Sequence, residues 1–276
     1  MAKGNNNQML IKNIRFLLII VILVSSNLNA EIIEVDFAYI GHEEHPALLG
    51  VKQGIDESNL QGQFLNQKYN LEIISENKIQ KHNFTKYIAI LTTVKSEELK
   101  NLAKELTDIP VFNLTDESNE LRINCITNVL HITPSSKMKA DALKQWQTKT
   151  PDSKANPQSW HYSFKKFAAR DLNKRFKKNY KTNMDDYSWA GWAAVKMTSD
   201  TVARTKIINA KNMLNYLKTK LTFDGQKGSD MNFRITGQLR QLILLVEDNK
   251  VIAEAPIRGI AKPPTLESLG ILDCSK

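Results

Sequence analysis

The tetrapeptide His-Glu-Glu-His at residues 42–45 carries side chains that can bind a metal ion or transfer protons. A zinc-binding HExxH motif needs its two histidines four positions apart on a helix, so that both imidazoles reach the same ion. Here the histidines are three positions apart, and Pro46 follows them directly. We therefore predict a polar loop ahead of a helix that begins at Pro46, and no metal site.

Other patterns that carry chemistry are absent or ambiguous. The sequence has no GxSxG motif, no Walker loop, no GxGxxG motif and no CxxC pair. Asp185 and Asp186 could bind a hard metal, but aspartates at the start of a helix more often cap it. Trp189 and Trp192 suit a helix core, with a stacking cage for a ring-shaped ligand as the alternative. We predict a protein that is not an enzyme, without catalytic residues or cofactor.

The first thirty residues have the order of a secretory signal peptide. Three basic residues precede the apolar run Phe16–Val24, and a short polar stretch follows it. This run is too short to cross a bilayer as a helix, which takes roughly 20 residues. We predict cleavage after Ala30, or after Ser26, and a mature protein in the periplasm.

The chain is basic, with a formal net charge of +9. The lysines are spread along the sequence and form no aromatic-basic motif for nucleic acid, which an exported protein is not expected to meet. The charge indicates solubility and attraction to anionic partners or surfaces. Residues 160–180 concentrate it in one amphipathic segment, read as a solvated helix face or, alternatively, as a binding face for an anionic partner.

The first half of the mature chain alternates apolar and amphipathic segments. Strands are expected at residues 31–40, 69–75, 87–91, 109–114 and 128–132, with helices after Pro46, from Ser96 and from Ser135 or Ser136. Such apolar strands separated by helices predict an α/β fold with a parallel sheet covered on both faces. In the second half of the chain we expect a polar loop at 148–159 and helices at 160–180, 185–204 and 210–220. Strands are expected at 232–235, 241–247 and 251–255.

In parallel sheets, the loops after the carboxyl ends of the strands form the ligand crevice. This rule selects side chains after the first, third and fourth strands. The candidates are Tyr39, Gly41, His42, Glu43, Thr92, Thr93, Asn113 and Thr115. Hydroxyls and free backbone amides there can hold a carboxylate or another anion. The alternative for all of them is ordinary turn and cap chemistry.

The two cysteines, Cys125 and Cys274, are an even pair in a chain predicted to enter an oxidising compartment. Such a pair predicts a disulfide. It would close a loop of about 150 residues and contribute about 2–4 kcal/mol of stability. Two separately buried thiols are the alternative.

Several phrases of the sequence resemble a known family. They are NVLH at 128–131 after Cys125, TPS at 133–135, ADAL at 140–143, WAGWAAVK at 189–196, FDGQ at 223–226, and GQLRQ at 237–241 followed by ILLV at 243–246. In this order they resemble the type I periplasmic solute-binding proteins of ABC importers. The resemblance is greatest to the ABC transporter substrate-binding proteins associated with PQQ-dependent alcohol dehydrogenases.

This resemblance implies a periplasmic-binding-protein type I fold and a role in solute uptake. The partners would be a small-molecule solute, an ABC permease and a periplasmic quinoprotein dehydrogenase. One departure concerns residues 135–276, which lack the parallel strands that would begin a second lobe. We therefore expect a parallel-sheet lobe at 31–134 and a reduced second lobe with hinge segments at 135–276. Because the second lobe is reduced, a second function stays open. The protein would then be a periplasmic accessory protein that binds no solute and contacts a quinoprotein dehydrogenase or another partner.

Overall fold

A computed structural model describes residues 32–228 and 230–274 of the chain. The chain divides into two units, Met1–Ile33 and Glu34–Lys276, and the second contains the hydrophobic core. The predicted signal peptide, residues 1–30, lies outside the described residues. Among the residues that the structure does describe, no helix is both long and apolar enough to cross a membrane.

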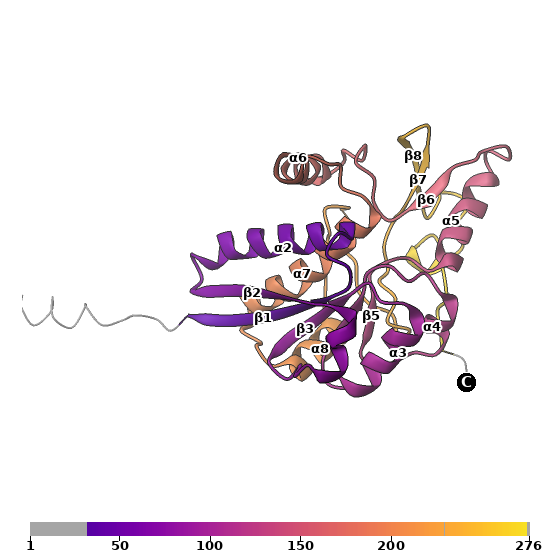
Figure 1. Cartoon of the computed structure of the whole chain (residues 1–276). Coiled ribbons are helices and arrows are strands. Elements are labelled where there is room, and N and C mark those ends of the chain that lie inside the picture. Colours follow the sequence, from indigo (N-terminus) through magenta and orange to yellow (C-terminus); the bar gives the residue numbers. More distant parts are fainter. Residues whose placement is uncertain (1–31, 229, 275–276) are drawn as a thin grey trace, which may run out of the picture. The chain divides into compact units, whose positions relative to one another are not determined.

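A five-stranded sheet forms the centre of this unit, with strand order β2-β1-β3-β4-β5 (Figure 1). The strands are β1 (Ile33–Ile40), β2 (Gln67–Ile74), β3 (Tyr87–Thr92), β4 (Val111–Asn113) and β5 (Val129–His131). β1 pairs with β3, β3 with β4 and β4 with β5, all in parallel. The register places Thr92 beside both Ile40 and Asn113. The strand ends therefore share one carboxyl edge.

Helices cover both faces of the sheet, as the sequence predicts. On one face, Leu99 and Leu102 of α3 (Ser96–Glu105) belong to the same buried cluster as Ile90 of β3. On the other, α2 (Pro46–Gly62) lies along α7 (Asp186–Thr205). Gly50 permits this close approach, because a Cβ there would lie only 1.7 Å from the Ser188 carbonyl oxygen. The short α4 (Asn119–Ile123) and the 3₁₀ helix η1 (Glu76–Lys81) follow β4 and β2, and α8 (Ala210–Thr219) contacts β3.

The remaining elements form a second, smaller sheet with its own core. Antiparallel strands β6 (Asn156–Gln158), β7 (Ile243–Glu247) and β8 (Lys250–Ala255) pack against α5 (Ser136–Gln147). Met138 of α5 and Leu245 of β7 belong to this core, which also takes in Leu269 near the end of the chain. α6 (Ala169–Tyr180) and the 3₁₀ helix η2 (Leu266–Ser268) complete the described elements.

Three expectations for this second part are wrong in detail. The loop predicted at 148–159 contains β6, which tolerates Pro157 because it lies at a sheet edge. The helix predicted from Trp160 begins only at Ala169, since Phe167 has a φ of +52° and cannot continue a helix. The strand predicted at 232–235 is reduced to an isolated bridge between Phe233 and Leu239.

Candidate functional site

The ends of β1 and β3 meet where Gly41 approaches Thr93. Gly41 has a φ of +153°, and a Cβ there would lie 2.0 Å from the Thr93 hydroxyl oxygen. The buried Tyr39 donates its hydroxyl to the His42 carbonyl oxygen at 3.3 Å and lies 3.4 Å from Thr93 Oγ1. Burial raises the pKa of Tyr39, and the nearby Glu76 raises it further. Glycine thus brings the loop after β1 against Thr93, beside a phenol that stays neutral.

An open cavity of about 700 Å³, most of whose lining residues are exposed, lies beside this junction. Small-molecule pockets are commonly about 300–1,000 Å³ in volume, and this volume falls within that range. His42 and Thr93 line it together with side chains from η1 and the start of α3, which are Glu76, Asn77, Gln80, Lys95, Glu97 and Glu98. Three carboxylates against one ammonium make this lining anionic. It therefore favours a ligand that carries a positively charged group.

The structure brings together four of the eight residues selected from the sequence. The four that lie at this junction are Tyr39, Gly41, His42 and Thr93. Two of these, His42 and Thr93, also line the cavity. Glu43 is exposed in the same turn and is not among the lining residues.

The other three candidates make hydrogen bonds within the protein. The Thr92 hydroxyl donates to the Ile40 carbonyl oxygen at 3.0 Å. Asn113 Oδ1 accepts from the backbone N–H groups of Thr115 (3.2 Å) and Asp116 (2.9 Å), which forms an Asx turn after β4. The Thr115 hydroxyl donates to the Thr93 carbonyl oxygen at 3.4 Å. These side chains shape the carboxyl edge, and a role for them in ligand binding stays a prediction.

His45, the second histidine of the tetrapeptide, is the N-cap of α2. Its Nδ1 accepts the backbone N–H of Ala47 at 3.1 Å, and its ring packs edge-on against Tyr187. Burial lowers the pKa of His45, in keeping with a neutral ring that accepts a hydrogen bond. Across residues 32–228 and 230–274, no three His, Cys, Asp or Glu side chains gather in a way that could hold a metal ion.

Asp185 and Asp186 have separate roles at the start of α7. Asp185 caps the helix, as predicted, by accepting the Ser188 N–H at 2.8 Å. Asp186 instead accepts from the Ser159 hydroxyl (3.0 Å) and the Trp160 N–H (2.7 Å) of the second part. Burial raises the pKa of Asp186. This carboxylate therefore attaches the segment after β6 to the helices of the first sheet.

Lys227 is a fully buried lysine that no pattern in the sequence singles out. Its Nζ lies 4.0 Å from the ring centroid of Trp189 and donates to Gln241 Oε1 (2.8 Å) and the Leu242 carbonyl oxygen (3.1 Å). Trp189 in turn stacks on Trp160, with an interplanar angle of 8°. Burial lowers the pKa of Lys227 to about 7. Both tryptophans are buried, and so is Trp192, which confirms the core positions predicted for Trp189 and Trp192.

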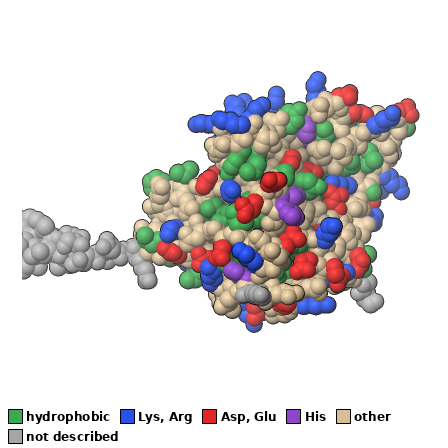
Figure 2. All heavy atoms as spheres, viewed as in Figure 1, with side chains coloured by type: hydrophobic (Ala, Val, Ile, Leu, Met, Phe, Trp, Pro, Cys, Tyr) green, Lys and Arg blue, Asp and Glu red, His purple; other side chains and the backbone are tan. Residues whose placement is uncertain are grey.

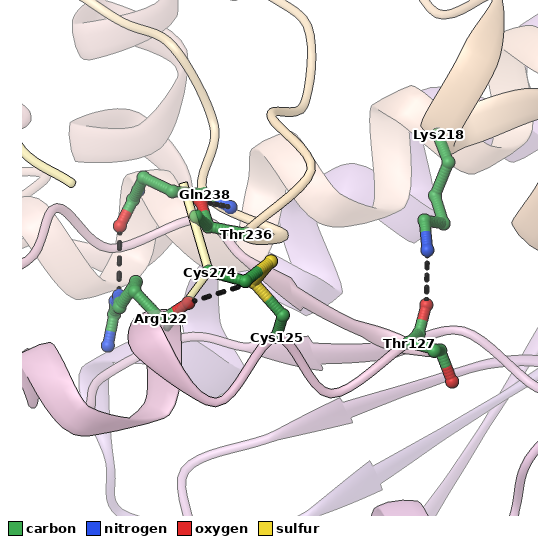
Figure 3. The surroundings of a disulfide bond; sticks show 7 residues. All are labelled: Arg122, Cys125, Thr127, Lys218, Thr236, Gln238 and Cys274. Atoms are coloured by element: carbon green, nitrogen blue, oxygen red, sulfur yellow. Dashed lines mark hydrogen bonds between the residues drawn. A yellow bond between two sulfur atoms is a disulfide. The ribbon is translucent and has the colours of Figure 1, made fainter. Parts of the chain in front are cut away.

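Arg122 connects the end of β5 to a late segment of the chain. Its guanidinium donates to Gln238 Oε1 and to the Thr133 carbonyl oxygen, each at 2.9 Å. Gln238 Nε2 donates to the carbonyl oxygens of His131 (3.2 Å) and Thr133 (3.1 Å). Figure 3 shows the two side chains facing each other. Burial lowers the pKa of Arg122 to about 10.

A disulfide joins Cys125 to Cys274, as the sequence predicts (Figure 3). Cys125 comes just after α4, so the bond attaches the end of the chain to the edge of the first sheet. Arg234 also holds this tail by donating to the carbonyl oxygens of Leu266 and Leu269, both at 2.6 Å. The carboxyl-terminal segment is therefore anchored by a covalent bond and by buried hydrogen bonds.

Comparison with known proteins identifies this architecture. No family model and no curated protein sequence matches the chain. A branched-chain amino acid ABC transporter periplasmic ligand-binding protein from Burkholderia xenovorans LB400 matches in structure with a TM-score of 0.67. It is 11% identical, and the match covers 78% of this chain and 90% of that one. The fold is that of a type I periplasmic binding protein.

Two further structures with this type I fold contain ligands. An ABC transporter substrate-binding protein from Desulfitobacterium hafniense in complex with Leu has a TM-score of 0.65 at 10% identity, and the match covers 79% of this chain and 98% of that one. A solute-binding protein from R. palustris in complex with benzoate has a TM-score of 0.61 at 10% identity. The match covers 80% of this chain and 94% of that one. These neighbours are solute-binding proteins, not enzymes.

Proposed function

We propose that this protein is the exported solute-binding component of an ABC importer, and that its solute binds in the cavity beside Gly41 and Thr93. The position of that cavity carries the proposal, since it lies at the carboxyl ends of β1 and β3 of a parallel sheet. The type I periplasmic-binding fold supports it, because solved proteins with this fold hold solutes such as Leu and benzoate. The protein would catalyse no reaction and would deliver the solute to a membrane permease.

The lining of the cavity narrows the class of solute. Glu76, Glu97 and Glu98 can together attract an ammonium group, and Lys95 can pair with a carboxylate. A zwitterionic amino acid satisfies both kinds of group. Benzoate carries only a negative charge and would meet three carboxylates. We therefore propose an amino acid or a related amine as the solute.

Two further parts of the proposal rest on the sequence. The signal peptide predicted at residues 1–30 supports export to the periplasm, where the neighbour from Burkholderia xenovorans also acts. The resemblance to receptors associated with PQQ-dependent alcohol dehydrogenases supports a link to alcohol oxidation. A quinoprotein dehydrogenase would then be a second partner besides the permease.

One observation favours a second candidate function, that of an accessory protein without a solute. All residues lining the cavity precede residue 134, so the smaller second part contributes none of them. Arg175 of α6 also pairs with Glu57 of α2 at 2.8 Å, which joins the two parts outside the cavity. A receptor whose second lobe does not reach the ligand would act by contacting another protein.

A thermal-shift panel separates these functions. The panel contains amino acids, PQQ, short alcohols and acids, and rare-earth ions. The receptor hypothesis predicts a saturable rise in melting temperature with an amino acid, since a ligand at 100 times its Kd stabilises the folded state by about 2.7 kcal/mol. Silence across the panel would favour the accessory role. Capture of a permease or of a dehydrogenase from a periplasmic extract would then identify the partner.

A matched pair of variants tests the position of the site. Thr93→Val removes a hydroxyl that lines the cavity and keeps the side-chain volume. Thr148→Val makes the same change at an exposed site after α5. The first variant should weaken the thermal response to the amino acid, and the second should leave it unchanged.

A further inference from the structure

The outward face of α6 carries a continuous row of basic side chains. The first of them is Arg170, and the others follow it by four, seven, eight and eleven positions. This spacing places the side chains on one face of a helix. This basic row consists of Arg170, Lys174, Lys177, Lys178 and the C-cap Lys181, all exposed. Leu172 and Phe176 are buried on the opposite face. Figure 2 shows the resulting group of blue side chains at the upper left, over α6.

Most of this charge is not neutralised within the protein. Residues 165–181 contain eight Lys and Arg and a single acid, Asp171. Three of the eight pair with carboxylates: Arg170 with Asp171 at 3.5 Å, Lys166 with Glu254 at 2.5 Å and Arg175 with Glu57 at 2.8 Å. Among the residues that the structure describes, Lys174, Lys177 and Lys178 make no ion pair. The basic row therefore presents a positive potential to the solvent.

Exposed aromatic rings adjoin the basic row at the start of α6. The side chain of Phe167 is 59% exposed and that of Tyr162 is 39% exposed. The Phe167 ring rests on Gly228, where an added Cβ would lie 2.2 Å from it. This ring is therefore held at the surface, and it follows Lys165 and Lys166 directly in the sequence. Basic residues next to exposed aromatic rings are typical of segments that lie at a membrane interface.

We propose that α6 and the loop before it bind the surface of a bilayer that contains anionic phospholipids. Four of the five members of the basic row are lysines, whose ammonium groups act as point charges and suit a diffuse layer of headgroup phosphates. The row lies on the exposed face of α6, and Leu172 and Phe176 are buried on the opposite face. A partner protein recognised through carboxylates would be better served by arginines in a fixed, bidentate arrangement. This surface is separate from the cavity beside Thr93.

Vesicle co-sedimentation of the full chain tests the proposal. The vesicles consist of phosphatidylcholine with or without phosphatidylglycerol, at low salt and at about 0.5 M salt, where surface charges are screened. One variant carries Lys174→Gln, Lys177→Gln and Lys178→Gln. The matched control carries Lys78→Gln, Lys104→Gln and Lys154→Gln, three exposed lysines on other elements. Each variant loses three positive charges. Residues 1–31 are identical in all samples, so they cannot cause a difference in binding between the variants.

The proposal predicts binding to the phosphatidylglycerol vesicles that disappears at high salt. The α6 variant should bind on the order of 100-fold more weakly, and the control should bind like the wild type. Amide hydrogen exchange should also slow in peptides from Tyr162 to Lys181 when these vesicles are added. Equal binding by both variants together with unchanged exchange would overturn the proposal. If the full chain bound soluble polyglutamate through α6 and did not bind the vesicles, the proposal would be overturned and the surface assigned to an acidic protein instead.

Discussion

Replacing Lys227 with methionine should remove a rise in stability that the wild-type protein shows between pH 7 and pH 9. In the folded protein, burial beside Trp189 lowers the pKa of Lys227 to about 7. In the unfolded chain its pKa is about 10.4. The unfolded state therefore binds more protons in this range, and the free energy of unfolding increases as the pH rises. Well below pH 7 the lysine is charged in both the folded and the unfolded state, so it no longer changes the free energy of unfolding with pH.

The size of the effect follows from the two pKa values. Linkage gives an increase of about 2 kcal/mol in the free energy of unfolding between pH 7 and pH 9. Methionine keeps the apolar stem of the side chain and has no titrating group. It also leaves Gln241 Oε1 and the Leu242 carbonyl oxygen without their donor, which costs about 1–3 kcal/mol at every pH. The slope with pH, not the absolute stability, therefore reports the buried charge.

Urea unfolding at pH 7, 8 and 9 measures this slope in the wild type, in Lys227→Met and in the control Lys177→Met. Lys177 is exposed on α6 and makes no ion pair within the described part of the chain. The wild type and the control should gain about 2 kcal/mol over the range, and Lys227→Met should stay level. A slope in Lys227→Met equal to that of the wild type would refute the reasoning, because it would mean that Lys227 stays protonated throughout.

Three further predictions concern stability. Cys274→Ser should lower the free energy of unfolding by about 2–4 kcal/mol; alkylation of the unreduced wild-type protein after unfolding should label no thiol, and two labels would contradict the disulfide. Stability should fall as the pH drops from 6.5 to 5, because burial lowers the pKa of His131 well below its usual value and only the unfolded chain then takes up the proton; an equal fall in His131→Leu would exclude this cause. Trp160→Ala should cost about 3–5 kcal/mol in urea unfolding through loss of packing on Trp189, whereas Tyr162→Ala at the surface should cost under about 0.5 kcal/mol.

The middle of the first sheet was predictable because its strands are buried on both faces there. β3 is buried along its whole length and β1 ends in the buried apolar segment 37–40, and local composition is enough to identify such strands. Asp185 was likewise predictable as a cap, since capping depends on neighbours in the sequence. The resemblance to type I periplasmic binding proteins agreed with the fold of the solved neighbours.

The start of α6 was not predictable in this way. Trp160 and Phe164 are spaced like residues of one helix face, yet both are buried from a turn segment. Trp160 is held there by its stack on Trp189 and by the hydrogen bond from its backbone N–H to Asp186. Both contacts join residues distant in the sequence, and helical spacing alone does not reveal them.

The candidate site was partly predictable for a related reason. The rule about carboxyl ends of parallel strands depends on topology, so it selected Gly41 and Thr93 from the strand pattern alone. It did not select Glu76 or Glu97, which enter the cavity from the elements after β2 and β3. Glu97 also reads as a favourable charge in the first turn of a helix, and that local role concealed its place in the cavity.

Titration calorimetry of the amino acid that gives the largest thermal shift tests the central claim most directly. It is carried out on the wild type, on Glu97→Gln in the cavity and on Glu105→Gln, an exposed carboxylate at the other end of α3. We predict one site per chain, with affinity reduced in Glu97→Gln and unchanged in Glu105→Gln. Binding that is identical in all three proteins would contradict the assignment of the cavity, and no heat with any amino acid would contradict the receptor function itself.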